Sequence, residues 1–114
     1  MTKLIKDIQT LSASAGTFTR LDFGMDESDW RAAQGKSSSY VIGWWEGKVG
    51  AVDFPPSTST EAFLITEGRI ALTDIEGNRK EFKAGEAHLV PPGFEGHWET
   101  LEDAKKFYVL LEQE

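Results

Sequence analysis

Residues 61–93 read EAFLITEGRIALTDIEGNRKEFKAGEAHLVPPG, and the fold class can be predicted from this stretch. Short runs of β-branched and aromatic residues alternate here with Gly, Asn and Pro, which is typical of an all-β domain. Gly77-Asn78 tolerates the positive φ that a tight hairpin needs. The stretch therefore predicts that Arg69–Thr73 and Arg79–Phe82 pair as antiparallel strands.

The same pattern of short apolar runs and turn residues continues on both sides of this hairpin. Turn residues recur at roughly 8–12-residue spacing, which favours a β-sandwich or barrel. Pro91-Pro92 must end the run before it, because proline donates no ladder hydrogen bond. Eight short strands fit a double-sheet jelly roll with an irregular N-terminal arm. The predicted strands are Ser39–Trp45, Val49–Phe54, Ala62–Thr66, Arg69–Thr73, Arg79–Phe82, Ala87–Val90, His97–Thr100 and Lys106–Leu111.

The N-terminal third lacks the regular pattern of short apolar runs found in the rest of the chain. We interpret residues 1–36 as an arm that packs on the barrel and residues 37–114 as the folded domain, since 114 residues suit one hydrophobic core. One helical turn is expected around Asp26–Ala33, with Asp26 or Ser28 as its N-cap.

Composition limits the possible partners. Twelve Lys and Arg against nineteen Asp and Glu give a formal net charge of −7, which repels a phosphate backbone, so nucleic acid is not an expected partner. The absence of Cys excludes disulfides, thiolate metal sites and thiol nucleophiles, and it fits a reducing compartment. No apolar run suggests a signal peptide or a membrane span. We therefore expect a cytoplasmic protein that does not bind membranes.

Two motifs resemble those of the cupin superfamily. Glu61 followed after six residues by Gly68 resembles the end of the first cupin motif. Gly85, followed after five residues by Pro91 and then by Gly93, resembles the start of the second. The resemblance implies a double-stranded β-helix, or jelly-roll barrel.

Further positions resemble one branch of that superfamily. Trp45-Glu46 looks like the pair that opens these domains, and Trp98-Glu99 and Lys105-Lys106 look like parts of their closing strands. The branch contains small domains related to the cupin domain of ureidoglycine aminohydrolase. The resemblance covers the residues from Gly43 to Glu112.

The metal ligands of a typical cupin are mostly missing. A metal-binding cupin supplies two His and one Glu from the first motif and one His from the second. Neither possible spacing of the first His pair supplies an imidazole: the positions fall on Pro55 and Ser57, or on Phe54 and Pro56. The third falls on Gly96, and His97, one residue late, should point to the opposite face. We predict no cofactor, and His97 and Glu61 would hold a divalent transition metal only if a bulge in 93–96 shifts the register.

A barrel without a metal still encloses a pocket. Strand alternation places Glu61 and Phe63 on one face, with Trp98 and Thr100 directed inward. If Glu61 is buried without a cation, its pKa should rise and it could act as a general acid or base; alternatively it is hydrogen-bonded to a Tyr or Trp. The predicted ligand-pocket residues are Trp45, Glu61, Phe63, Trp98, Thr100 and Tyr108.

Other polar and aromatic residues have two interpretations each. Trp44 and Trp45 should point to opposite faces, one of them toward a dimer partner or the arm. Lys105-Lys106 either meets an acidic ligand or is a solvated pair at a strand end. His88, like His97, is interpreted as a surface or partly buried strand residue.

Three functions follow as hypotheses. The first is the binding of a small metabolite in the barrel without the usual metal. The second is a small aminohydrolase-like or isomerase-like enzyme, possibly metal-dependent, with Glu61 as general base. The third is a structural or interaction domain. A homodimer is expected in each case, since exposed edge strands and many aromatic residues favour a covered edge or face.

Overall fold

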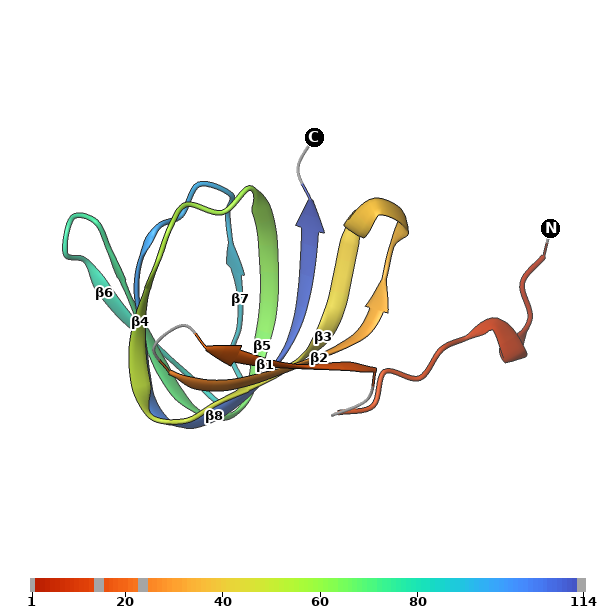
Figure 1. Cartoon of the computed structure of the whole chain (residues 1–114), viewed down its shortest axis with the longest axis horizontal. Coiled ribbons are helices and arrows are strands. Elements are labelled where there is room, and N and C mark those ends of the chain that lie inside the picture. The colour runs from red at the N-terminus through yellow and green to blue at the C-terminus, as the bar shows by residue number, and fades with distance from the viewer. Residues whose placement is uncertain (1, 14–15, 23–24, 113–114) are drawn as a thin grey trace.

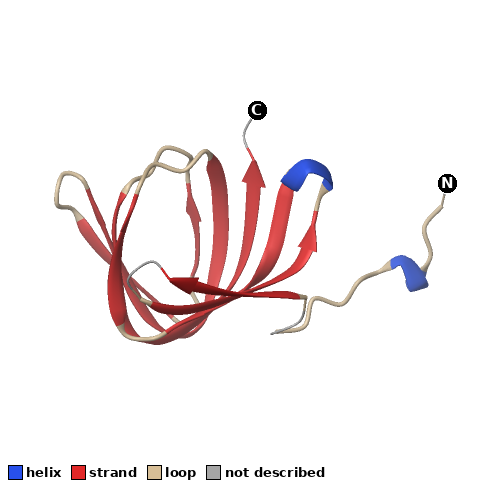
Figure 2. Cartoon of the chain, in the orientation of Figure 1, coloured by secondary structure: helices blue, strands red, loops and turns tan. Residues whose placement is uncertain are grey.

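Strands make up most of the molecule. The computed structural model describes residues 2–13, 16–22 and 25–112. Its eight strands form one sheet that curls around a common centre, and two three-residue 3-10 turns are the helical segments (Figures 1 and 2). The jelly-roll prediction is confirmed. The elements are η1 (Ile5–Asp7), β1 (Thr17–Asp22), β2 (Asp26–Gln34), η2 (Lys36–Ser38), β3 (Tyr40–Gly47), β4 (Gly50–Phe54), β5 (Ser59–Asp74), β6 (Arg79–Lys83), β7 (Ala87–Val90) and β8 (Gly96–Glu112).

Two long strands, β5 and β8, serve both layers of the barrel. They pair with each other along most of their length. The first part of β8 also pairs with β4 and its second part with β3, while β5 pairs first with β7 and then with β6. The predicted runs Ala62–Thr66 and Arg69–Thr73 are therefore one strand, as are His97–Thr100 and Lys106–Leu111.

Gly68 explains why β5 bends without ending. The β5–β8 register shifts around this residue, which has a φ of 81°. A Cβ here would lie 2.2 Å from the carbonyl oxygen of Asp103. A bulge with glycine at its centre bends a strand while the flanking pairs remain. Gly68, the glycine of the first cupin-like motif, is the point where β5 passes from one layer to the other.

The predicted hairpin is confirmed between β5 and β6, where Leu72 lies opposite Lys80. Gly77 has a φ of 89°, whereas Asn78 does not use the positive region. Instead the Asp74 carboxylate accepts hydrogen bonds from the backbone N–H groups of Glu76 and Asn78 at 2.9 and 3.0 Å. One Asp side chain thus holds the turn together. β7 ends at Val90, as the following prolines predict.

The helical turn predicted for Asp26–Ala33 is wrong, because these residues belong to β2. Its inner face carries Glu27 and Asp29, which are buried. Pairing with β1 and β3 satisfies the backbone of β2 in the ladder. Tertiary pairing therefore overrides the local preference of Asp and Ser for a helix N-terminus. The arm contributes two strands to the sheet, so it is less irregular than expected.

The two adjacent tryptophans of β3 point to opposite faces, as predicted. Trp45 is buried in the core, and the Trp44 indole donates a hydrogen bond of 3.1 Å to the Leu11 carbonyl. Gln9 makes a second tie, from its amide to the Ala32 carbonyl at 2.8 Å. Beyond these contacts residues 2–13 lead away from the barrel (Figure 1).

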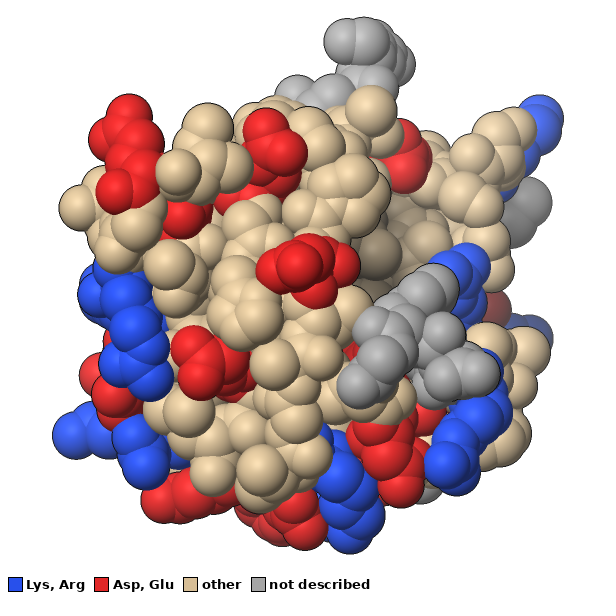
Figure 3. All heavy atoms as spheres, turned by 60° about the vertical axis from the view of Figure 1, so that its left-hand side comes forward, with Lys and Arg blue, Asp and Glu red and all other residues tan. Residues whose placement is uncertain are grey.

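The surface carries its charges in small groups. Figure 3 shows one face, on which Asp and Glu are scattered over the middle and Lys and Arg gather toward the edges. Within the described ranges, neither helical segment has the length and apolar character to cross a membrane.

Candidate functional site

One cavity lies inside the barrel and is lined by residues from five strands. It has a volume of about 480 Å³, within the usual range for small-molecule sites. We call it the indole cavity after its two tryptophans. Its lining residues are Glu27, Trp45, Val52, Asp53, Phe54, Pro55, Glu61, Trp98 and Lys106.

Lys106 is the central charged group of the indole cavity. Its ammonium lies 2.7 Å from Oε2 of Glu61, and the two side chains are only 9% and 25% exposed. Four aromatic rings have their centres 4.7 to 5.9 Å from the same nitrogen: those of Trp45, Phe63, Trp98 and Tyr108. Ring faces attract a cation, and the carboxylate supplies its counter-charge. Lys106 is therefore held in one position by both.

Glu27 is the second buried acid of the indole cavity. Its Oε1 accepts a hydrogen bond of 2.9 Å from the Trp45 indole, while its Oε2 is buried without a partner. Burial raises the pKa of Glu27, and the nearby Asp29 acts in the same direction. The Trp45 hydrogen bond and the Lys106 charge oppose this rise. A hydrogen-bond donor that reached Oε2 would stabilise the ionised carboxylate.

The six predicted pocket residues divide into two groups. Three of them line the indole cavity, and the other three are buried behind its wall. The Tyr108 hydroxyl donates a hydrogen bond of 2.7 Å to Asp29, and burial raises its pKa. Thr100 accepts a hydrogen bond of 3.0 Å from the Trp98 indole. The lining residues are Trp45, Glu61 and Trp98, and those behind the wall are Phe63, Thr100 and Tyr108.

Glu61 has a cation beside it, the Lys106 ammonium at 2.7 Å. Burial without a counter-charge is therefore not what the structure shows, because Lys106 occupies one of its oxygens. The hydrogen-bond partner of Glu61 is this ammonium, and not the Tyr hydroxyl or Trp indole expected as the alternative. Lys105, the neighbour of Lys106, points outward and pairs with Glu46 and Glu67.

The donor set does not fit the transition metal of a typical cupin. His97 is 41% exposed and does not line the cavity, although its Nδ1 lies 2.7 Å from the carboxylate of the lining residue Asp53. The positive charge of Lys106 beside Glu61 opposes a second cation at that carboxylate. The described parts of the chain bring no three His, Asp or Glu side chains into a metal-binding group.

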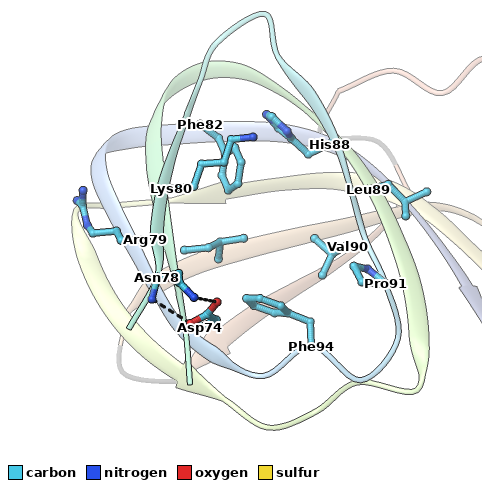
Figure 4. Close-up of a pocket in the computed structure, with 11 residues that line it drawn as sticks. Asp74, Asn78, Arg79, Lys80, Phe82, His88, Leu89, Val90, Pro91 and Phe94 are labelled. Carbon is cyan, nitrogen blue, oxygen red and sulfur yellow. Dashed lines mark hydrogen bonds between the residues drawn. The ribbon is translucent and has the colours of Figure 1, made fainter. Parts of the chain in front are cut away.

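A second cavity of about 320 Å³ opens at the β6–β7 side of the barrel (Figure 4). We call it the Phe82 cavity. It shares no lining residue with the indole cavity. Its lining residues are Leu72, Asp74, Asn78, Arg79, Lys80, Phe82, His88, Leu89, Val90, Pro91 and Phe94.

Aromatic rings separate the two cavities. The Phe63 ring lies 5.7 Å from the His88 ring on one side and 6.3 Å from the Trp98 ring on the other, between centroids. Phe54 of the indole cavity and Phe94 of the Phe82 cavity are in contact at 5.5 Å. Phe63, predicted to line a pocket, is thus part of the partition between two.

Sequence reasoning missed Glu27 and undervalued Lys106. Glu27 lies in the segment predicted to be helical. Strand alternation, which places Glu27 and Asp29 on one face, therefore did not enter the prediction. For Lys106 the signal was present, because it follows the parity of Tyr108, a residue predicted to face the pocket. A charged residue on an inward parity position indicates a buried ion pair or a site.

Comparisons with known proteins give the family. Residues 34–108 match the family model described as the EutQ-like cupin domain. The chain belongs to this cupin family. A search of the curated proteins finds no match to this cupin.

Solved structures support the same fold at low sequence identity. A putative ethanolamine utilization protein Q from Salmonella typhimurium is 19% identical, with a TM-score of 0.73 over 85% of this cupin and 80% of that chain. A predicted oxalate decarboxylase from Thermotoga maritima is 15% identical, with a TM-score of 0.73 over 92% and 100%. Ectoine synthase from P. lautus is 14% identical, with a TM-score of 0.69 over 82% and 68%.

These likenesses confirm the cupin resemblance that the two motifs carry. The narrower resemblance to ureidoglycine aminohydrolase stays a prediction, as do the homodimer and the cytoplasmic location. The neighbours differ in the activities that their names give, so the fold alone does not select a function for this cupin.

Proposed function

We propose that this cupin binds a small metabolite in the indole cavity without a transition metal, and that the ligand carries an amino group on a short apolar body. The observation that supports this most is Glu27, a buried carboxylate on the cavity wall with one oxygen that has no partner. An unmet hydrogen bond at a buried oxygen costs about 1–3 kcal/mol. A ligand ammonium would supply the missing donor once the Glu27 side chain turns this buried oxygen toward the cavity.

The charges of the lining favour a cation. Three carboxylates, those of Glu27, Asp53 and Glu61, stand against the single ammonium of Lys106. Lys106 already neutralises Glu61 at 2.7 Å. The remaining negative charge lies at Glu27 in the interior and at Asp53 at the rim, and both attract a positively charged ligand.

The aromatic walls suit the same ligand. Trp45 and Trp98 meet edge to face, with centroids 5.4 Å apart and an interplanar angle of 73°. Indole faces bind ammonium groups and also bury apolar carbons. Val52 and Phe54 extend this apolar wall toward the mouth. A short amine with an aliphatic or aromatic body matches these surfaces.

An enzymatic role for Glu61 is the second candidate. Glu61 would accept a proton from a bound substrate as general base. Its pairing with Lys106 uses one of its two oxygens and leaves the other for this task. Chemical change of a bound ligand would favour the enzyme, and a domain that binds neither amine nor acid would favour a structural role.

Titration calorimetry with benzylamine and butylamine tests the proposal, with benzyl alcohol as the neutral comparison. Glu27→Gln removes the unpaired charge, and Glu46→Gln is its matched control, because Glu46 neighbours Trp45 but pairs with Lys105 outside the cavity. We expect Glu27→Gln to weaken benzylamine binding about tenfold, equivalent to about 1.4 kcal/mol, with no change in Glu46→Gln. Equal affinities in both variants, or no binding of either amine, would overturn the proposal.

A further inference from the structure

The Phe82 cavity differs in charge from the indole cavity. Asp74 lines it, but its carboxylate accepts hydrogen bonds from the hairpin turn, including one from the Asn78 amide at 3.0 Å. Arg79 lies at its edge and is paired with Glu81 at 2.8 Å and Glu99 at 3.7 Å. The Arg79 charge is therefore already neutralised by the protein, whereas the Asp74 carboxylate keeps its charge and directs its oxygens to donors of the turn.

Lys80 is the cation of this cavity that has no counter-ion among the described residues. It shares the inward parity of Phe82 on β6, so its aliphatic stem lines the cavity. Its ammonium lies 5.4 Å from the centre of the Phe82 ring. Figure 4 shows the Lys80 chain and the His88 ring both reaching the space beside Phe82.

His88 supplies a second polar group. Its ring lies 4.1 Å from the Phe82 ring between centroids, and its Nε2 is buried without a hydrogen-bond partner. Burial lowers the pKa of His88, and the charge of Lys80 lowers it further, while Glu86 acts in the opposite direction. The ring is thus a neutral imidazole at neutral pH. Once the ring turns about its Cβ–Cγ bond, its N–H can donate a hydrogen bond to an acceptor in the cavity.

We propose that the Phe82 cavity is a second binding site, specific for a small organic anion: a monocarboxylate with a short aliphatic or aromatic body. The carboxylate lies between the Lys80 ammonium and the His88 ring. The apolar body packs against Phe82 and Phe94, with Leu72 and Val90 behind it. The assignment is independent of the amine site, because the cavities share no lining residue.

The carboxylate satisfies both polar groups at once. A carboxylate accepts two charge-assisted or neutral hydrogen bonds in different directions, so Lys80 and His88 need not share one oxygen. The aromatic and aliphatic wall buries the body of the ligand. An amine in this position would meet Lys80 as a like charge, so this cavity selects against the ligand proposed for the indole cavity.

Calorimetric titration with benzoate, and with benzamide as its neutral counterpart, tests the site. Lys80→Met keeps the apolar stem and removes the charge. Lys83→Met is the matched control, since it removes the same charge from the outer face of the same strand. We expect benzoate to bind at least about tenfold more tightly than benzamide, and Lys80→Met to lose about tenfold in benzoate affinity while Lys83→Met keeps it.

Proton NMR of the two histidines gives a second readout on the unmodified protein. Bound benzoate should raise the pKa of His88, because an anion beside the ring favours imidazolium. His97, which lines neither cavity and pairs with Asp53 at the rim of the indole cavity, serves as the internal control. Equal benzoate affinity in Lys80→Met and Lys83→Met, or an unchanged His88 titration in saturating benzoate, would overturn the proposal.

Discussion

The indole cavity and the Phe82 cavity share one barrel, yet they are assembled in different ways. The Phe82 cavity takes all its residues from the continuous segment 72–94. The indole cavity takes its residues from positions as far apart as Glu27 and Lys106. The Phe82 cavity holds Lys80 on an exposed strand, and the indole cavity holds the buried ion pair of Lys106 and Glu61. Long-range strand pairing thus places the charges of the indole cavity in the interior, whereas the local hairpin leaves the charge of the Phe82 cavity at the rim.

The largest effect is expected when the partition between the cavities is removed. Phe63 is 3% exposed and contacts rings of both cavities. Phe63→Ala should lower the free energy of unfolding by about 4 kcal/mol, through lost burial and a new void. Urea denaturation measures this change. Leu89→Ala, at a residue exposed on β7, is the control and should change stability by less than about 0.5 kcal/mol.

The same variant tests whether the cavities are independent. In the unmodified protein benzoate should not change the affinity for benzylamine, whereas in Phe63→Ala each probe should alter the other's affinity, because one joined cavity must hold both. Calorimetry of each probe with the other present measures this coupling. Strong coupling in the unmodified protein would contradict the partition.

The next largest effect concerns the buried ion pair of the indole cavity. Lys106→Met should destabilise the protein by about 3 kcal/mol, since it leaves a half-buried Glu61 without its cation. Lys105→Met removes a similar charge from the exposed neighbour and should cost less than about 1 kcal/mol. Adding Glu61→Leu to Lys106→Met should restore part of the loss. Equal losses for the two lysines would show that the pair is screened by water.

The smallest expected effect is the pH dependence of stability, which has opposite signs for the buried groups of the two cavities. The raised pKa of Glu27 means that the folded state holds this proton more tightly than the unfolded state. Its contribution to stability is full below its ordinary pKa of 4.5 and is lost as the pH rises through the folded pKa. The lowered pKa of His88 has the opposite sign: its contribution is present above 6.5 and is lost as the pH falls through the folded pKa.

Denaturation curves at several pH values check these opposite signs. On acidification the unmodified protein should gain stability relative to Glu27→Gln and lose stability relative to His88→Asn. His97→Asn is the control for the second comparison, because His97 lies outside both cavities. The same direction in both comparisons would contradict the assignment of a buried acid to one cavity and a buried neutral imidazole to the other.

Much of the fold was predictable because its signals are local. Gly77 beside alternating runs predicted the β5–β6 hairpin, and Pro91-Pro92 predicted the end of β7. Strand parity placed Trp98 inward and put Trp44 and Trp45 on opposite faces, and the structure shows that Trp45 is the buried one. What failed was the segment Asp26–Ala33, whose Asp and Ser residues favour a helix start in isolation but pair with β3 in the protein.

Local sequence patterns were enough to predict an all-β domain, its central hairpin and inward strand faces, because a period of two residues and a turn glycine act within a few positions of the chain. The cupin superfamily came from the resemblance of two motifs. The pairing of Lys106 with Glu61, the place of Glu27 in the cavity and the division of the interior by Phe63 became visible only in the folded barrel. These outcomes depend on the register between strands far apart in sequence. Register is selected by the packing of the whole barrel and not by any one segment.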